Sequence, residues 1–127
     1  MKINNLQNLN TEALAYMGDA VYEKYIREML LLRGFAKANN LHKAATRYVK
    51  AHAQAQVIRE LFDELTEKEQ SLVKRARNHR YSSKAKNADP ITYKWATGFE
   101  ALIGYLYLAD EDERLKHIME RAVEIIG

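Results

Sequence analysis

The chain has no cysteine among its 127 residues, so a disulfide, a zinc–thiolate site and a thiol nucleophile are all excluded. It has one proline and five glycines, and few residues would therefore interrupt a helix. No apolar run approaches the roughly 20 residues that span a membrane. The first ten residues, MKINNLQNLN, lack the apolar centre of a signal peptide. We therefore expect a cytoplasmic protein with no membrane segment.

The residues that are present indicate a compact chain. Hydrophobic residues make up 47% of the sequence and charged residues 29%, as in ordinary globular proteins. A chain of this length is usually one domain that buries about two-thirds of its unfolded surface. We therefore expect residues 1–127 to form a single domain.

Helix signals recur along the whole chain. Apolar residues three and four positions apart, with N-cap candidates Asn10 and Thr11 and a stop at Gly34, predict a first helix that ends near Arg33. Residues 36–63 indicate one bent helix or two. The later helix starts carry capping residues: Thr66 with Glu69, Asp89 before Pro90, and Asp110 with Glu113. No segment alternates with period two, so the sequence predicts an all-α fold.

Two carboxylates stand in otherwise apolar or small-residue helices. Asp19 lies in TEALAYMGDAVYE and Glu100 in GFEALIGYLYL, and neither has a base three or four positions away. An acid near a core is costly unless it is hydrogen-bonded, protonated or bound to a cation. Each helix also carries a glycine, Gly18 or Gly104, and glycine weakens a helix. The two acids are therefore not explained as residues that stabilise their helices. The pair predicts a metal site.

Glu12 is a weaker candidate for the same site. It lies seven positions before Asp19, on one helical face with Ala15 between them. A carboxylate in a first helical turn is also favoured by the helix dipole, which explains Glu12 without any metal.

One stretch of the chain is basic without any acid. We predict that it contacts an RNA phosphate backbone, since each neutralised phosphate releases counterions. A solvated basic loop is the general alternative for such a run. The residues expected to bind RNA are Lys74, Arg75, Arg77, Asn78, Arg80, Lys84 and Lys86.

Two motifs carry a family resemblance. EALAYMGD, residues 12–19, resembles the ribonuclease III signature, and FEALIGYLYL, residues 99–108, resembles that family's second acidic motif. The resemblance implies an all-helical, homodimeric endonuclease domain that cleaves double-stranded RNA with Mg²⁺. It also implies that Asp19 and Glu100 are the catalytic residues and metal ligands, with Glu12 acting through water.

The departures from the family pattern narrow the resemblance. Ala15 and Thr97 stand where the family usually has acids, and the chain length leaves no room for an appended double-stranded-RNA-binding domain. A catalytic domain of this kind resembles the Mini-ribonuclease III branch, which is associated with maturation of precursor 23S ribosomal RNA. Whether a ribosomal protein assists, where the RNA is cut, and whether one or two metals bind stay open.

Other classes of protein remain to be weighed. A non-catalytic RNA-binding or ribosome-associated module could keep this fold and lose the chemistry. One group of helical nucleotide phosphohydrolases relies on a His-Asp pair, and none of the four histidines precedes an aspartate. Another group uses repeated Glu-x-x-Glu motifs on core helices, and Glu64 with Glu67 has that spacing but falls at a helix boundary. A purely structural dimerisation protein leaves the acids in apolar helices unexplained. The sequence favours the endoribonuclease.

Overall fold

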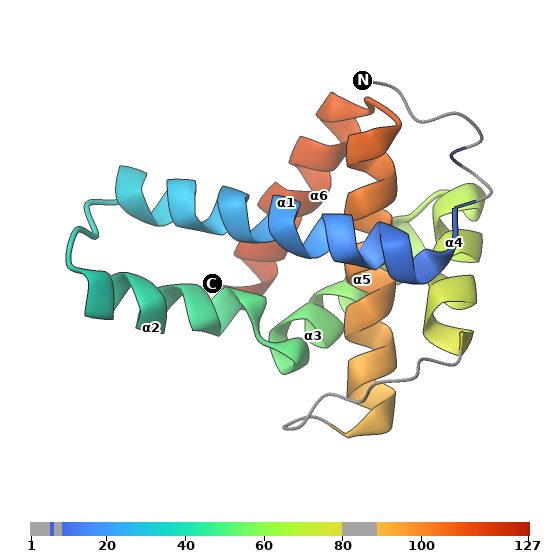
Figure 1. Cartoon of the computed structure of the whole chain (residues 1–127), viewed down its shortest axis with the longest axis horizontal. Helices are drawn as coiled ribbons and strands as arrows, with labels where there is room; N and C mark the ends of the chain where they lie inside the picture. The colour runs from blue at the N-terminus through green and yellow to red at the C-terminus, as the bar shows by residue number, and fades with distance from the viewer. Residues whose placement is uncertain (1–5, 7–8, 80–88) are drawn as a thin grey trace.

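The computed structural model describes residue 6 and residues 9–79 and 89–127, whose course is drawn in Figure 1. These residues form α1 (Thr11–Leu32), α2 (Ala38–Val49), α3 (Ala51–Leu61), the short 3-10 helix η2 (Phe62–Glu64), α4 (Glu67–Asn78), α5 (Pro90–Leu108) and α6 (Asp112–Ile126). The described ranges contain no strand, which confirms the all-α prediction. None of the helices in them is long and apolar enough to cross a membrane.

Three helix starts follow the sequence prediction. The side chain of Asn10 accepts a hydrogen bond from the Ala13 amide at 2.7 Å and so caps α1. Thr66 and Glu69 form both halves of a capping box at the start of α4. Asp89 accepts from the Thr92 amide at 2.9 Å and caps α5. These contacts satisfy backbone donors that have no partner inside the helix.

Two boundaries were settled by the structure. Residues 36–63 form two helices rather than one bent helix, since Lys50 takes an extended conformation between α2 and α3. The predicted capping box of Asp110 and Glu113 is wrong. Asp110 has a φ of +58°, and its amide donates to the Tyr107 carbonyl at 3.1 Å. Asp110 therefore ends α5 in a left-handed turn, and α6 begins two residues later.

Helix α5 is the centre of the molecule, with α1, α3, α4 and α6 packed around it (Figure 1). Its middle is buried on nearly every side, as expected for a helix surrounded by others. Tyr22 of α1 meets Phe99 of α5 edge-on, with ring centroids 4.9 Å apart. Such a pair adds about 0.5–1.5 kcal/mol beyond the burial of the rings. Tyr22 is fully buried, so it is a core residue.

The crossing of α1 and α5 is a contact between backbones. A Cβ on Gly18 would overlap the carbonyl oxygen of Glu100, and a Cβ on Gly104 would overlap the carbonyl oxygen of Leu14. Each glycine therefore faces the main chain of the other helix. The two glycines allow the axes to approach more closely than any other residue would permit.

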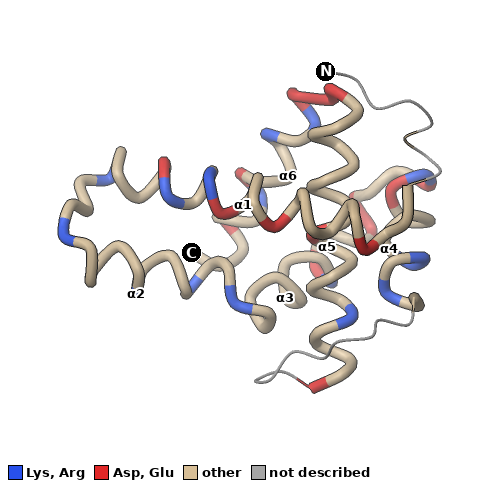
Figure 2. The backbone as a smooth tube through the Cα atoms, in the orientation of Figure 1, with Lys and Arg blue, Asp and Glu red and all other residues tan. Residues whose placement is uncertain are grey.

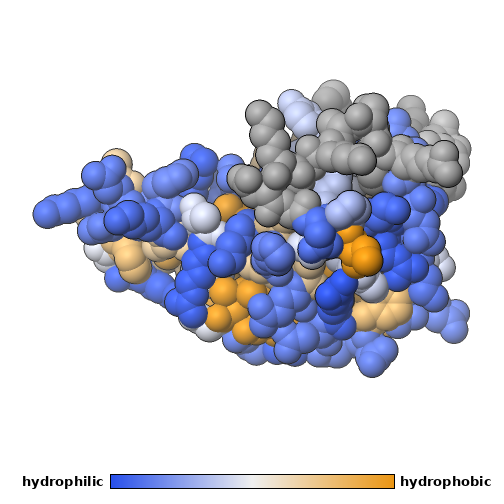
Figure 3. Space-filling model, turned by 90° about the horizontal axis from the view of Figure 1, so that it is seen from below, coloured by the Kyte–Doolittle hydropathy of each residue, from blue (hydrophilic) through white to orange (hydrophobic). Residues whose placement is uncertain are grey.

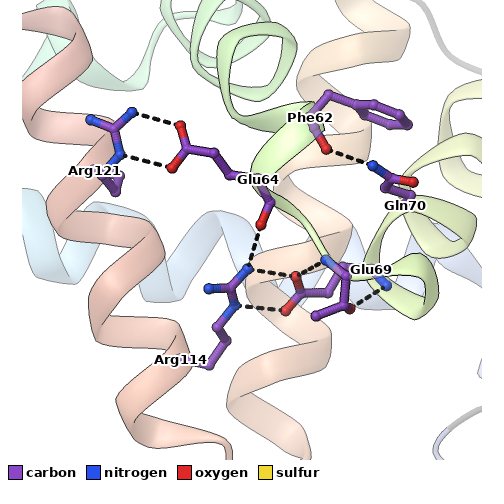
Figure 4. Close-up of polar contacts among 7 residues, drawn as sticks. Phe62, Glu64, Glu69, Gln70, Arg114 and Arg121 are labelled. Carbon is purple, nitrogen blue, oxygen red and sulfur yellow. Dashed lines mark hydrogen bonds and ion pairs between the residues drawn. The ribbon is translucent and has the colours of Figure 1, made fainter.

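Helix α6 is tied to the turn before α4 by ion pairs (Figure 4). Arg114 donates to both carboxylate oxygens of the buried Glu69, at 2.8 and 2.9 Å, and to the Glu64 carbonyl at 3.3 Å. Arg121 reaches the Glu64 carboxylate at 2.8 Å. A two-point contact between an arginine and a carboxylate fixes orientation as well as distance, so these pairs set the position of α6.

The surface is mostly polar. On the face in Figure 3, apolar residues gather in separate patches among hydrophilic ones. Large apolar side chains with more than a third of their surface exposed are Tyr16, Leu31, Leu32, Phe35, Ile91 and Tyr107.

We expect Gly18→Ala and Gly104→Ala each to destabilise the protein by several kcal/mol, because the helices must move apart. Gly98→Ala is the matched control on α5. Its Cβ would lie 3.1 Å from a side-chain methyl of Val73 and 3.3 Å from the Val73 carbonyl oxygen, contacts that are tight but do not overlap the backbone as at Gly18 and Gly104. Alanine is also the better helix former by about 1 kcal/mol. Denaturant unfolding would measure all three. Equal losses of stability for the three variants would contradict the backbone contact.

Candidate active site

The glycine crossing brings Asp19 and Glu100 together. Asp19 follows Gly18, and Glu100 is the residue whose carbonyl Gly18 touches. The charge of Asp19 raises the pKa of the Glu100 carboxyl group, so the two side chains lie near each other. Figure 2 shows the acidic positions along the part of α1 that crosses α5. Residues 81 positions apart in sequence thus form one site.

The two acids differ in their surroundings. Asp19 is exposed, so the prediction that both acids lie in apolar surroundings holds only for Glu100, which is half-buried. Burial, followed by the charge of Asp19 and the hydrogen bond to it, raises the pKa of Glu100 to about 9. Glu23 raises it further, while a hydrogen bond from Gln54 opposes the shift. Glu100 therefore carries a proton at neutral pH unless a cation takes its place.

This pair suits a hard divalent cation. Mg²⁺ binds oxygen ligands and is usually held by one or two protein carboxylates, with water completing the shell. An exposed acid beside a half-buried one leaves one side of the site open to solvent. Within residues 9–79 and 89–127, no three side chains of His, Asp or Glu form a group that could hold a metal. The ligands that the described residues offer are therefore two carboxylates.

Glu12 is exposed in the first turn of α1. It lies seven positions before Asp19, or about 10 Å along the helix axis, so the two carboxylates do not contact each other directly. Ala15 and Thr97 stand where the ribonuclease III pattern usually has acids, and both residues are buried. The Thr97 hydroxyl donates to the Tyr93 carbonyl at 2.9 Å, so it is occupied within its own helix.

Sequence reasoning missed Gln54 on α3, which is 3% exposed, donates to the Val49 carbonyl at 2.9 Å and lowers the pKa of Glu100. A signal was present in the sequence. Gln54 precedes the buried Ile58 and Leu61 by four and seven positions, so helical spacing places it on the apolar face of α3. A polar residue there needs a partner, and the Val49 carbonyl is one.

The described part of the basic stretch is divided between two faces of α4. Lys74 lies over the Phe62 ring at 5.6 Å, and Arg77 lies over the Trp95 ring at 4.7 Å and donates to Asn78 at 3.2 Å. Arg75 lines a separate hollow with, among others, Lys68, Tyr105 and Arg114. Arg80, Lys84 and Lys86 lie outside the described residues.

Arg59 also belongs beside Lys74 and Arg77, although it lies on α3 and outside the basic stretch. Its guanidinium stands 5.4 Å from the Trp95 ring centre. Trp95 packs edge-on against Phe62, with centroids 6.0 Å apart. Two aromatic rings thus hold three cations from two helices, by contacts typical of cation–π pairs. Only the fold brings Arg59 to this surface.

The chain is similar to known proteins over nearly its whole length. Residues 12–111 match the ribonuclease III domain family, a range that contains Asp19 and Glu100. The Mini-ribonuclease 3 of Symbiobacterium thermophilum is 48% identical over 126 residues, covering 99% of this chain and 97% of the relative. That of Brevibacillus brevis is 50% identical, covering 92% and 87%. A crystal structure of a Fusobacterium nucleatum protein superposes with a TM-score of 0.84 at 28% identity, over 98% of both chains.

The raised pKa of Glu100 predicts how stability varies with pH. Between its ordinary value of 4.5 and about 9, the unfolded chain releases this proton and the metal-free native protein keeps it. This group therefore makes the protein less stable as pH rises through that range, by at most about 1.4 kcal/mol per pH unit. Glu100→Gln should remove the decline and be more stable than wild type near pH 8, but not near pH 5. Urea unfolding in EDTA would measure this. Parallel pH profiles for the two proteins would contradict the assignment.

Proposed function

The chain belongs to the ribonuclease III family and is an endoribonuclease, and from this we propose that it cleaves double-stranded RNA with Mg²⁺ at the Asp19–Glu100 pair. The observation that carries the proposal is the contact between these two carboxyl groups at the α1–α5 crossing. Both acids lie within the residues that match the family.

The proposed metal site has two protein ligands. Asp19 and Glu100 would be its protein ligands, and Glu12 would act through a water molecule. When bound, Mg²⁺ lowers the pKa of a coordinated water and stabilises negative charge on the phosphate. Glu100 must lose its proton for the cation to bind, so binding should release protons near neutral pH. The fixed helix crossing keeps both carboxylates in place before RNA arrives.

The proposed substrate is precursor 23S ribosomal RNA. This rests on the resemblance to Mini-ribonuclease III, and the curated relatives bear that name. A ribosomal protein partner would fit the same role. A-form RNA shows its phosphates and 2′-hydroxyls across a broad minor groove, so recognition should depend mainly on shape.

We also propose a homodimer whose interface involves α1 and α5. Tyr16, three residues before Asp19, is 83% exposed, and Tyr107 of α5 is 47% exposed. Aromatic side chains are enriched at interfaces, which makes this pair better candidates than the buried Tyr22. A two-fold dimer would place one site near each RNA strand and allow a staggered cut.

Asp19→Asn and Glu100→Gln should each reduce cleavage of long double-stranded RNA in Mg²⁺ by at least about a thousandfold, because the amides keep the shape but remove a charged ligand. Glu12→Gln should have a milder effect. Product sizes on a gel, with and without Mg²⁺, measure this, and circular dichroism checks the fold. If the wild-type protein binds the RNA without cutting it, a non-catalytic RNA-binding module is the better description.

Replacing both Lys74 and Arg77 with Ala should weaken RNA binding and reduce the slope of log K against log salt by roughly one for each phosphate that the variant no longer neutralises. The rate at saturating RNA should stay near that of wild type, because the two bases contribute equally to binding of substrate and transition state. Lys116→Ala on α6 is the control for simple removal of a surface charge. Unchanged affinity of the double variant at two salt concentrations would show that this surface is only solvated.

Sedimentation at micromolar concentration should give twice the 14.7 kDa chain mass. Tyr16→Ser should weaken association more than Leu32→Ser, which removes an exposed apolar residue at the far end of α1. A wild-type protein that is an active monomer would refute the dimer. A larger effect of Leu32→Ser would move the interface away from the Asp19 end of the helix.

A further inference from the structure

The ring of Trp95 is in contact with cations from two helices. The guanidinium carbon of Arg59, on α3, lies 5.4 Å from the centre of the ring, and that of Arg77, on α4, lies 4.7 Å from it. Both helices pack against α5, which carries Trp95 (Figure 1). The two positive charges are therefore within about 10 Å of each other, roughly one Debye length at 0.1 M salt. Salt does not screen them fully, so an anion bound to both would relieve their repulsion.

No carboxylate of the chain neutralises these bases. The sequence has 17 acidic residues, and all of them lie at positions that the structure describes. Among the described residues, four other bases form ion pairs with acids, whereas Arg59 and Arg77 form none. Lys74, which lies 5.6 Å from the Phe62 ring centre, is also absent from these ion pairs. The positive charge at this surface is thus available to an anion from another molecule.

The hydrogen-bond donors of Arg59 are available as well. A guanidinium that lies over an aromatic ring keeps its edge free, and the edge carries five N–H groups in a fork that matches two oxygens of a phosphate. Arg77 donates from one of these groups to the Asn78 side chain at 3.2 Å. Arg59 donates to no residue in the part of the chain that the structure describes, and it is exposed. Its whole fork can therefore receive a phosphate.

Trp95 restrains this cation before any ligand arrives. A free arginine side chain loses rotamer entropy when it is fixed by a ligand, and contact with a ring reduces that loss. Trp95 is itself held in place, because it packs edge-on against Phe62 with ring centroids 6.0 Å apart. The ring thus presents Arg59 in a position set by the core of the protein.

This surface and the acid pair lie on different sides of α5. Trp95 and Glu100 are five positions apart on the helix, so their side chains leave it about 140° apart. A phosphate at Trp95 is therefore not the one that is cleaved. It belongs to another part of the bound RNA, and a contact there contributes to binding rather than to the chemical step.

We infer that Arg59 binds a phosphate of the RNA substrate, at a site that it shares with Arg77, and that Trp95 is the positioning residue of this site. The inference rests on the proposed function in that it takes double-stranded RNA as the ligand. It extends the RNA-binding surface to α3, outside the basic stretch.

The test uses Trp95 as its own probe. It is the only tryptophan of the chain, so tryptophan fluorescence reports on this surface alone. Double-stranded RNA titrated into the protein in EDTA, where metal-dependent cleavage cannot occur, should change the Trp95 emission. Arg59→Gln should weaken RNA binding by about tenfold, as expected for the loss of one charged hydrogen-bonding group, and reduce the salt slope by roughly one.

Arg27→Gln is the matched control for Arg59→Gln. Arg27 is also an exposed arginine on a helix, but its charge is paired with Glu23 at 3.3 Å. Since an exposed ion pair contributes little, this variant should bind RNA within about twofold of wild type. Urea unfolding checks that both variants fold.

A second measurement tests the role of the ring. Trp95→Leu should weaken binding of a labelled RNA, followed by fluorescence anisotropy of the label. Arg59→Gln should cost less affinity in that background than in wild type, because the ring no longer positions the arginine. Equal effects in the two backgrounds would show that Trp95 does not position Arg59. If Trp95→Leu does not fold, Trp95→Phe, with a smaller ring, replaces it and should show the same coupling in weaker form.

Unchanged RNA affinity of Arg59→Gln at two salt concentrations would overturn the inference and leave the proposed function intact. So would a Trp95 emission that responds to polyglutamate but not to RNA, since the surface would then bind an acidic protein. RNA binding that depends on Arg59, in a wild-type protein that cuts no double-stranded RNA in Mg²⁺, would contradict the proposed cleavage alone. A wild-type protein that binds no double-stranded RNA would overturn both.

Discussion

The backbone contact between α1 and α5 is the constraint on which the rest of the molecule depends. Gly18 and Gly104 each lie against the main chain of the other helix, and the carbonyl that Gly18 touches belongs to Glu100. A close helix crossing and the position of an acid are therefore one feature. Among the described residues, α1 and α5 also share the most extensive contact between two helices, so the acid pair lies on a rigid part of the core.

The cost of this arrangement is electrostatic. Glu100 lies half-buried beside a second carboxyl group, which disfavours its charged form. A protein selected for stability alone would gain from an amide or an apolar residue here. A cation would relieve both the burial and the repulsion, so the same strain that weakens the metal-free protein favours metal binding. Gln54 opposes part of that cost, since it lowers the pKa of Glu100.

The surface around Phe62 and Trp95 shows how aromatic rings can organise positive charge. Arg59, Lys74 and Arg77 lie over these rings, so their stems are held in place and fewer rotamers would be lost on binding a phosphate. Trp95 is five residues before Glu100 on α5. Trp95, over whose ring Arg59 and Arg77 lie, and Glu100 are thus on the same helix, about 7–8 Å apart along its axis.

The sequence by itself determined the helices and the two acids. Capping residues act over three or four positions, so Asn10, Thr66 with Glu69, and Asp89 could be interpreted without knowing the fold. The capping box predicted for Asp110 with Glu113 was wrong, because Asp110 takes a left-handed conformation at the end of α5. The identity of the residue does not reveal that conformation.

Tertiary structure alone decided which distant residues meet. It placed Gln54 against the Val49 carbonyl, Arg59 against Trp95, and Tyr22 against Phe99 in the core. It also separated Arg75 from Lys74 and Arg77, because neighbouring residues on a helix point about 100° apart. Periodicity gives the face of a helix that a residue occupies, but the partner on that face comes from another helix whose packing no local pattern encodes.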